Sequence, residues 1–447
     1  MDCVIEKRLN KEIFRDNKEY FLTTMTDRFE YANILWANTL RKKYRKEFKP
    51  IFIQNCKQNR FFTKENYIIV NKIIDLERKK LGKHDIIYLE EYEDLNKEIS
   101  ESKTIKLLVD RLLKKQGRLF ILDFTSSFLN FRNSKIVILG PDPKIVTKLD
   151  NKIEHIKIFK KLNVPRNKVK IYKSLDKIEK APLPFYISAA YTSGGYESGP
   201  INNKKDMNKF KERLRKINKA NPFIVARLIK DISTSPNTNA IVYGAGKTEV
   251  ICVTDQILRG NRYLGNIYPS KASPKNKNKM IKVTKKIGNY LSRLGFRGVF
   301  GLDFIIDSKG NLYTVDLNPR RQGGYMCNLL MSKKIDITEL ELKVVLREKV
   351  GNFTYEDFLA SFSWAHSKVK PHSENKVLLK AFKYGDFKRP FNKIGETFRC
   401  VFYPAGYLVV SGNCGYIILS GKSLKEVESR VFSEIQKANF ACFGEKE

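Results

Sequence analysis

Residues 298–320 read GVFGLDFIIDSKGNLYTVDLNPR, in which two apolar runs flank the polar stretch Ser308-Lys309-Gly310-Asn311. A short turn with glycine at its second central position between two such runs predicts a β-hairpin. If the two central residues form the loop, the ladder places Asp303 opposite Asp316, with Asn318 on the same face. The stretch therefore predicts an antiparallel hairpin that gathers two carboxylates and one carboxamide.

Three oxygen-bearing side chains in one cluster favour a bound cation. Carboxylate and amide oxygens are the ligands that Mg²⁺ prefers, together with water and nucleotide phosphates. A solvent-facing hairpin whose Asp and Asn side chains are simply hydrated is the alternative. The next residues, Pro319-Arg320-Arg321-Gln322-Gly323-Gly324, favour the metal site because they place a guanidinium and the exposed amides of two glycines beside it.

The order of these residues resembles the signature of the ATP-grasp superfamily, in which an acidic residue in a strand and a short turn precede an acidic-x-Asn-Pro-Arg strand end. The resemblance implies that Asp303, Asp316 and Asn318 hold one or two Mg²⁺ ions, for which Mn²⁺ can substitute, against the phosphates of ATP. It also implies that Arg320 is a catalytic residue that steadies the phosphoryl group or the bound carboxylate.

Other segments resemble further parts of the nucleotide and substrate sites of this family. Lys152 matches the lysine that reaches the ATP phosphates, and Thr192-Ser193-Gly194-Gly195 matches the flexible loop that covers them. The stretch 226–231 matches the hinge that frames adenine. The implied ATP-binding residues are Lys152, Ser193, Gly194, Gly195, Arg227, Leu228 and Ile229, and the implied substrate-binding residues are Gln256, Gly323 and Gly324.

The activity implied is that of a carboxylate–amine ligase, which forms an amide or peptide bond through an acyl phosphate and releases ADP and phosphate. Two departures from the family pattern leave an alternative open. Ser188 stands where members usually have a second lysine, and the hinge has Arg227 and Lys230 where an acidic residue often meets the ribose. The alternative is a degenerate ATP-grasp module that binds nucleotide or an acidic macromolecule without catalysis.

The net charge of the chain is +37, from 85 Lys plus Arg against 48 Asp plus Glu. Such a field favours acidic partners, so a nucleic-acid-binding protein is a second alternative, and an acidic carrier protein or a tRNA is a candidate partner of a ligase. The basic residues are spread over every segment, which lysine-rich solvated faces explain equally well. The sequence leaves the oligomeric state open.

The cysteine and hydropathy patterns favour a cytoplasmic protein. The seven cysteines are widely spaced and form no CxxC pair or Cys/His metal pattern. No run reaches the roughly 18–20 apolar residues that a membrane span needs. We therefore expect a reduced setting and no membrane partner.

At 447 residues the chain exceeds the about 250–300 residues at which single cores stop growing. We expect a combination of α/β and α+β units: an N-terminal α/β (pre-ATP-grasp-like) domain at 1–145, then a two-lobed ATP-grasp fold. Its small lobe would cover 146–235, and its large lobe, with a C-terminal α+β extension, 236–447. Apolar spacing predicts helices over 66–81, 102–115, 205–219 and 276–294. The four histidines, His84, His155, His366 and His372, have no clustered partners in the sequence, so none is expected in the site.

Overall fold

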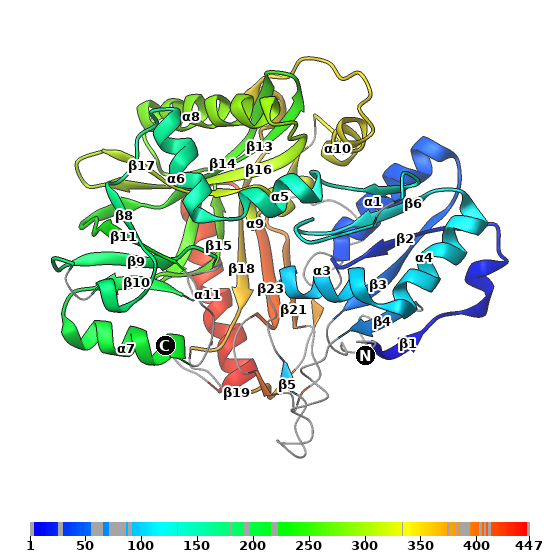
Figure 1. Cartoon of the computed structure of the whole chain (residues 1–447), viewed down its shortest axis with the longest axis horizontal. Coiled ribbons are helices and arrows are strands. Elements are labelled where there is room, and N and C mark those ends of the chain that lie inside the picture. The colour runs from blue at the N-terminus through cyan, green and yellow to red at the C-terminus, as the bar shows by residue number, and fades with distance from the viewer. Residues whose placement is uncertain are drawn as a thin grey trace.

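The structure is a computed structural model that describes the chain apart from residues 1–3, 26–29, 55–65, 71–85, 88–91, 132, 179–180, 192–196, 216–221, 333, 373–375, 381–382, 385–393, 402–404, 406–407, 410–412 and 445–447. The described strands form four sheets of six, four, ten and three strands. Figure 1 shows the six-stranded N-terminal sheet on one side of the ten-stranded sheet and the four-stranded sheet on the other.

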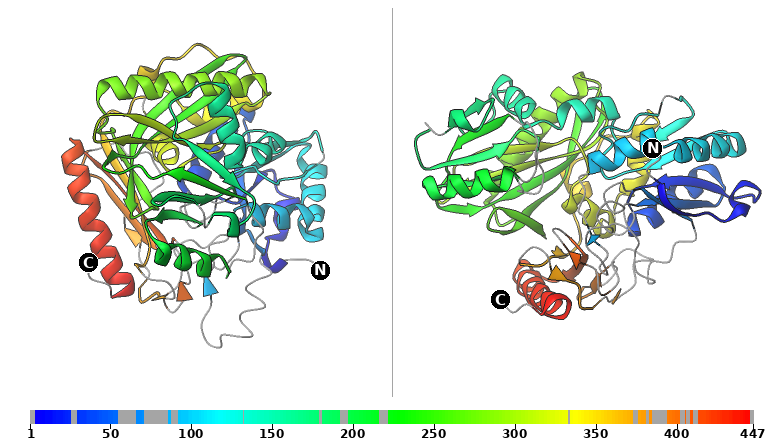
Figure 2. Two further views of the ribbon diagram at one scale, coloured as in Figure 1. Left: turned by 60° about the vertical axis from the view of Figure 1, so that its left-hand side comes forward. Right: turned by 60° about the horizontal axis from the view of Figure 1, so that its bottom comes forward.

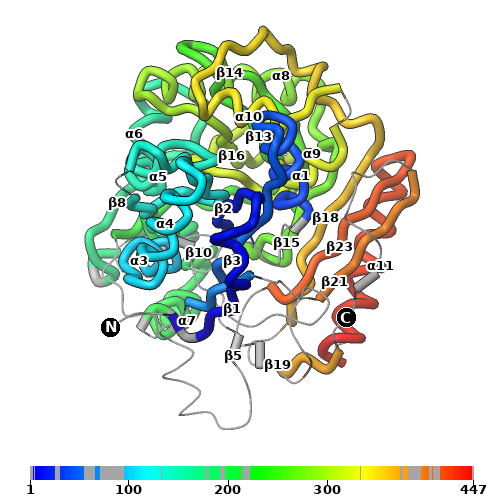
Figure 3. The backbone as a smooth tube through the Cα atoms, turned by 90° about the vertical axis from the view of Figure 1, so that its right-hand side faces the viewer, coloured from blue at the N-terminus to red at the C-terminus, as the bar shows by residue number. Residues whose placement is uncertain are grey.

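The N-terminal sheet has the strand order β1-β4-β3-β2-β6-β7. Figure 3 shows its strands β1, β2 and β3 from the side that faces away from the four-stranded sheet. Its strands run parallel, except that β1 pairs antiparallel with β4. The strands are β1 (Val4–Arg8), β2 (Glu19–Thr23), β3 (Phe48–Gln54), β4 (Tyr67–Val70), β6 (Leu119–Leu122) and β7 (Ile136–Ile138), and the helices are α1 (Glu30–Tyr44), α3 (Tyr92–Glu101) and α4 (Lys103–Gln116). The strand order reverses at β2, which is where open α/β sheets commonly bind ligands.

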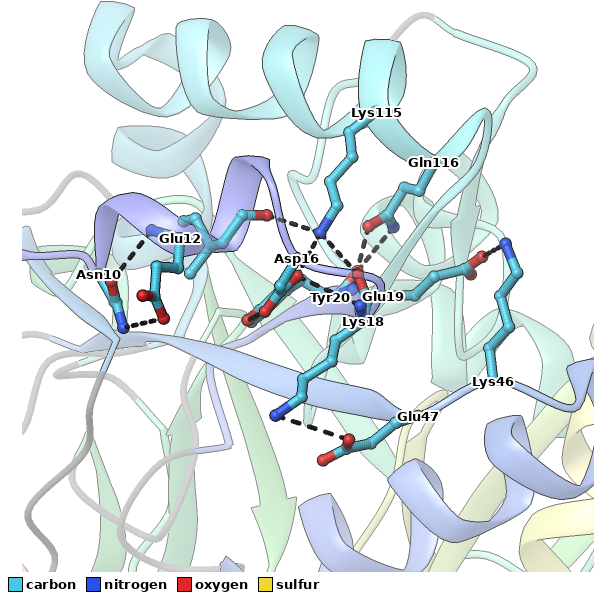
Figure 4. A network of polar contacts seen from close by, with 11 residues as sticks. Asn10, Glu12, Asp16, Lys18, Glu19, Tyr20, Lys46, Glu47, Lys115 and Gln116 are labelled. Carbon is cyan, nitrogen blue, oxygen red and sulfur yellow. Dashed lines mark hydrogen bonds and ion pairs between the residues drawn. The ribbon is translucent and has the colours of Figure 1, made fainter.

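A polar network ties the end of α4 to the start of β2 (Figure 4). The ammonium of Lys115 bonds to Asp16 at 2.7 Å and to two backbone carbonyls of the preceding loop. The amide of Gln116 accepts from the backbone N–H of Tyr20 at 3.0 Å and donates to its carbonyl at 2.8 Å. These bonds satisfy backbone groups that β2 does not pair with its neighbours.

The helix expected over 66–81 is wrong in its first residues, because Tyr67–Val70 forms the strand β4. This short run of β-branched residues is inserted between β3 and β1, where a buried strand fits and a helix does not. Residues 71–81 lie outside the described part of the chain. The helix expected over 102–115 is confirmed as α4, which Ser102 caps by accepting from the N–H of Ile105.

The four-stranded sheet is antiparallel and has the order β10-β9-β11-β8. Two helices, α5 (Pro143–Leu149) and α6 (Lys152–Lys161), lead into it from the N-terminal sheet. Its elements are β8 (Val169–Tyr172), β9 (Phe185–Ala189), β10 (Ser198–Ile201), α7 (Lys204–Arg215) and β11 (Phe223–Arg227). The predicted helix 205–219 is observed as α7 up to Arg215, and residues 216–219 are not described.

The ten-stranded sheet follows the order β12-β16-β13-β14-β15-β18-β23-β21-β20, with β17 paired to β16. Its strands are β12 (Ile232–Thr234), β13 (Pro236–Gly244), β14 (Lys247–Arg259), β15 (Arg262–Tyr268), β16 (Gly298–Asp307), β17 (Leu312–Asn318), β18 (Ser363–Val369), β20 (Lys383–Tyr384), β21 (Thr397–Val401) and β23 (Gly415–Gly421). The predicted helix 276–294 is observed as α8 (Pro274–Arg293), which Ser273 caps and which packs on β13 and β14.

The remaining helices lie around this sheet, as the rotated views show (Figure 2). They are α9 (Gly323–Met331), α10 (Ile337–Val345) and α11 (Leu424–Phe443), and α11 packs on β18 and β23. A small three-stranded sheet joins β19 (Lys376–Val377), β22 (Leu408–Val409) and β5 (Ile86–Ile87). None of the helices in the described residues combines the length and apolar character that crossing a membrane requires. The domain bounds at 145 and 235 stay a prediction, which the sheet membership supports.

Candidate active site

The hairpin β16–β17 pairs Asp303 with Asp316, as the sequence predicts, although its turn differs from the expected one. The ladder resumes at Ile306 and Leu312, so the loop is longer than two residues. The Asp307 carboxylate shapes it by accepting from the N–H groups of residues 309 and 311, at 3.0 and 2.8 Å. A bulge at Val315 then shifts the register by one residue, and the two departures cancel.

Asp303 is surrounded by side-chain amides. Its Oδ1 accepts from the amide nitrogens of Gln256 (3.0 Å) and Gln322 (3.2 Å), and its Oδ2 accepts from Asn318 (3.0 Å). Burial, and then the negative charge of Asp316, raise the pKa of Asp303 to about 6, against which these bonds act only in part. The predicted substrate contact Gln256 therefore lies at the proposed metal ligand itself.

Asp316 is held by two basic groups of α6. Lys152 Nζ lies 2.5 Å from its Oδ2, and His155 Nδ1 lies 2.9 Å from its Oδ1. Burial works against the ionised carboxylate, but Lys152 and His155 together outweigh it and lower the pKa of Asp316 well below the ordinary value. The expectation that no histidine joins the site is wrong, because His155 orients Asp316 while its Nε2 contacts the Leu149 carbonyl at 2.6 Å.

The placement of α6 explains this contact. Asn151 caps the helix by accepting from the N–H of Ile153, and the N–H of Lys152 donates to the carbonyl of Ala190 at the end of β9. Lys152 and His155 are three residues apart, so they share one helix face, and that face packs on β17. The spacing was visible in the sequence, but the packing partner was not.

Arg320 follows the end of β17, two residues after Asn318. Its Nη1 donates to the carbonyl of Arg321 at 3.1 Å, and its guanidinium carbon lies 5.3 Å from the ring centre of Phe124. The positive charge of Arg320 also favours the ionised form of Asp303, whose pKa it lowers. The structure thus brings Arg320 together with Asp303, Asp316 and Lys152.

The two glycines after Arg320 open α9 rather than an exposed loop. Gly324 is buried, and a Cβ on it would lie 3.2 Å from the amide nitrogen of Asn239. A Cβ on Gly323 would lie 2.3 Å from the Tyr263 hydroxyl. A side chain at either position would therefore make these neighbours shift, because α9 lies close to the sheet, and the amides are less exposed than we expected.

The other ATP-binding candidates are placed in part. Arg227 ends β11, and Leu228 and Ile229 follow it where the chain passes from the four-stranded to the ten-stranded sheet. Arg227 is exposed, and the next two residues are half-buried. Ser188 is buried and donates to the carbonyl of Ala189 at 3.1 Å. Ser193, Gly194 and Gly195 lie outside the described residues.

The donor set fits a magnesium ion that shares its ligands with a nucleotide. In the part of the chain that the structure describes, no three His, Cys, Asp or Glu side chains form a ready-made metal cage. Mg²⁺ commonly takes one or two protein carboxylates and completes its shell with water and substrate phosphates. The two facing carboxylates of Asp303 and Asp316, with the nearby amide of Asn318, match that pattern.

Comparison with known proteins agrees with this geometry. The family model described as L-aspartate–L-methionine ligase, ATP grasp, matches residues 164–318. Residues 164–318 are thus similar to the ATP-grasp region of an amino-acid ligase family. The L-propargylglycine–L-glutamate ligase of Streptantibioticus cattleyicolor is 31% identical over 100 residues, which are 22% of this chain and 20% of that protein. The carbamoyl phosphate synthase large chain of Clostridium botulinum is 23% identical over 245 residues, 52% of this chain and 21% of that protein.

The matches thus span about a fifth of these relatives' length. Solved structures match more of this chain. The biotin carboxylase domain of Hydrogenobacter thermophilus 2-oxoglutarate carboxylase, in complex with MgADP, has a TM-score of 0.62 at 14% identity and matches 94% of this chain and 90% of that one. Carboxyaminoimidazole ribonucleotide synthase from Aspergillus clavatus, with ATP, has a TM-score of 0.59 at 10% identity over 95% and 98%. They confirm the expected fold, an N-terminal α/β domain before a two-lobed ATP-grasp fold.

Proposed function

We propose that this protein is an ATP- and Mg²⁺-dependent ligase that joins two amino acids through an acyl phosphate. The observation that carries the proposal is the pairing of Asp303 with Asp316 beside Lys152 and Arg320. The matching family model and one relative support amino-acid substrates, because they are described as ligases that join aspartate or glutamate to a second amino acid. We infer that one substrate is an acidic amino acid.

Asp303, Asp316 and Asn318 would hold the metal, which when bound neutralises charge on the phosphates of ATP. Lys152 now supplies the positive charge beside Asp316. If Lys152 turns to a phosphate, Asp316 becomes available to the metal, so phosphate and cation would enter as a charge-balanced pair. Nucleotide and metal should therefore bind together far better than either binds alone.

The chemistry needs no protein nucleophile. A substrate carboxylate oxygen attacks the γ-phosphorus, the bond from that phosphorus to the β–γ bridging oxygen breaks, and ADP leaves. The amine nitrogen of the second substrate then attacks the acyl carbon, phosphate leaves, and the nitrogen gives up a proton. Arg320 is placed to balance negative charge in both steps, which is electrostatic stabilisation by a preorganised group.

ADP release with pairs of amino acids tests the function, with one acidic member in each pair. Asp316→Ala and Asn318→Ala should abolish release while the protein stays folded. Lys157→Met is the matched control, because Lys157 lies on the same helix but pairs with the exposed Glu154. If Asp316→Ala keeps wild-type turnover, the metal assignment is wrong.

A second candidate is nucleotide binding without catalysis, and the buried Ser188 in place of a phosphate-binding lysine is the observation that favours it. Tight binding of Mg·ATP with no ADP release for any amino-acid pair would support it over the ligase. An acidic carrier protein or tRNA as partner stays a prediction from the net charge. The five described cysteines are buried thiols that form no disulfide, which supports the predicted cytoplasmic setting.

A further inference from the structure

Arg321, the residue after Arg320, is a buried cation whose partners lie in distant parts of the chain. Its side chain is 2% exposed. Nη1 donates to the carbonyl of Asp123 at 2.6 Å, and Nη2 donates to the carbonyl of Leu139 at 2.6 Å. Nη2 also contacts both carboxylate oxygens of Glu341 in α10, at 2.9 and 3.1 Å. These contacts join the ATP-grasp lobe to the N-terminal sheet.

The two carbonyls belong to one edge of that sheet. Asp123 directly follows β6 and Leu139 directly follows β7, and these two strands are parallel neighbours. Beyond the strand ends, the neighbouring strand no longer supplies backbone N–H donors, so buried carbonyls there need a donor from elsewhere. The planar fork of a guanidinium presents donors on separate nitrogens at a fixed spacing, so Nη1 and Nη2 reach the two carbonyls and the carboxylate from one position.

Arg320 and Gln322, on either side of Arg321, belong to the proposed site. Arg320 donates to the main-chain carbonyl of Arg321 and lies over Phe124, the residue after Asp123. On the other side, Gln322 donates to Asp303 at 3.2 Å. The main chain between these two site residues is therefore held where the Arg321 side chain is anchored.

We propose that Arg321 is a positioning residue, which fixes the Arg320 guanidinium by anchoring its main chain to the carboxyl edge of the N-terminal sheet. This inference rests on the proposed ligase function. Folding alone does not require the Arg321–Glu341 ion pair, since apolar side chains of similar volume can replace a buried pair without loss of the fold. What they cannot replace is the simultaneous hold on β6, β7 and α10.

The double variant Arg321→Met/Glu341→Leu separates positioning from folding, because it removes both charges together and leaves neither buried alone. We expect a folded protein that keeps its Mg·ATP-dependent rise in thermal midpoint. Its kcat should fall on the order of 10²-fold, the loss typical of a misplaced catalytic group, with a much smaller change in KM for ATP. Arg321→Lys retains the charge opposite Glu341, so its kcat should lie between those of the wild type and the double variant. This single variant provides the test if the double variant does not fold.

The matched control is Lys43→Met/Glu348→Leu, which removes an ion pair between α1 and the segment after α10 on the same side of the molecule. It should leave kcat unchanged. Wild-type kcat in the Arg321→Met/Glu341→Leu variant would overturn the proposal. A crystal structure of that variant gives a readout that is independent of turnover. The proposal requires that the 3.1 Å contact from Arg320 Nη1 to the carbonyl of residue 321 is lost. If this contact is retained, the proposal is wrong, even if no amino-acid pair is ever ligated.

Discussion

Replacing Lys152 by methionine should convert the two facing carboxylates into a site that takes up Mg²⁺ without nucleotide. The ion pair with Asp316 spans 2.5 Å, and its side chains are 20% and 22% exposed. Breaking a fully buried pair costs about 3–5 kcal/mol, whereas an exposed pair contributes at most about 1 kcal/mol. For this partly buried pair we expect Lys152→Met to lower the free energy of unfolding by about 2–3 kcal/mol in metal-free buffer.

Magnesium should restore most of that loss. A ligand present at 100 times its dissociation constant adds about 2.7 kcal/mol, which is close to the expected deficit. The assay is denaturant unfolding with chelator and with millimolar MgCl₂, in the absence of nucleotide. Lys157→Met should change stability by less than about 0.5 kcal/mol, as exposed helix pairs do. If Lys152→Met responds to Mg²⁺ no more than the wild type does, the carboxylates are not a cation site.

Three further outcomes follow from particular residues. The pKa of Asp303 is raised to about 6, so its ionisation lowers the stability of the metal-free protein as pH rises from about 4 to 6. The stabilisation by Mg·ATP should weaken as pH falls from 7 to 5, because Asp303 becomes protonated, and thermal midpoints at both pH values check this. Asp303→Asn should abolish the pH dependence of the Mg·ATP effect. Gly301→Ala would place a Cβ 1.9 Å from the Gln322 amide oxygen, so it should displace that side chain from Asp303 and slow ADP release with a stability loss of only about 1 kcal/mol. Arg45→Gly should raise the unfolding free energy by about 0.5–1 kcal/mol in denaturant titrations, because Arg45 has a φ of 59° that disfavours a side chain; a decrease would contradict this reasoning.

The fold and the carboxylate pair could be predicted from the sequence because both depend on local patterns. Strand period and a glycine turn predicted Asp303 opposite Asp316, and the pairing is observed because the longer loop and the bulge at Val315 cancel. The helix expected over 66–81 failed for the opposite reason, since the run at Tyr67–Val70 is short and its state is decided by the strands on either side.

The contacts that complete the site could not be predicted, because they depend on tertiary packing. His155 reaches Asp316 across 161 positions, and Arg321 meets Asp123 across 198. Only the three-residue spacing of Lys152 and His155 hinted at the first contact. Nothing in the sequence around Arg321 distinguished it from a surface cation in a chain this basic.

The compensated geometry of the β16–β17 hairpin limits how this segment can evolve. Side chains alternate between the two faces of a strand, so a one-residue deletion at Val315 alone would carry either Asp316 or the turn residues to the wrong side. A second change of one residue in the loop would restore the alignment. Length changes here should therefore be tolerated in pairs and eliminated singly, even though most of the intervening side chains can vary.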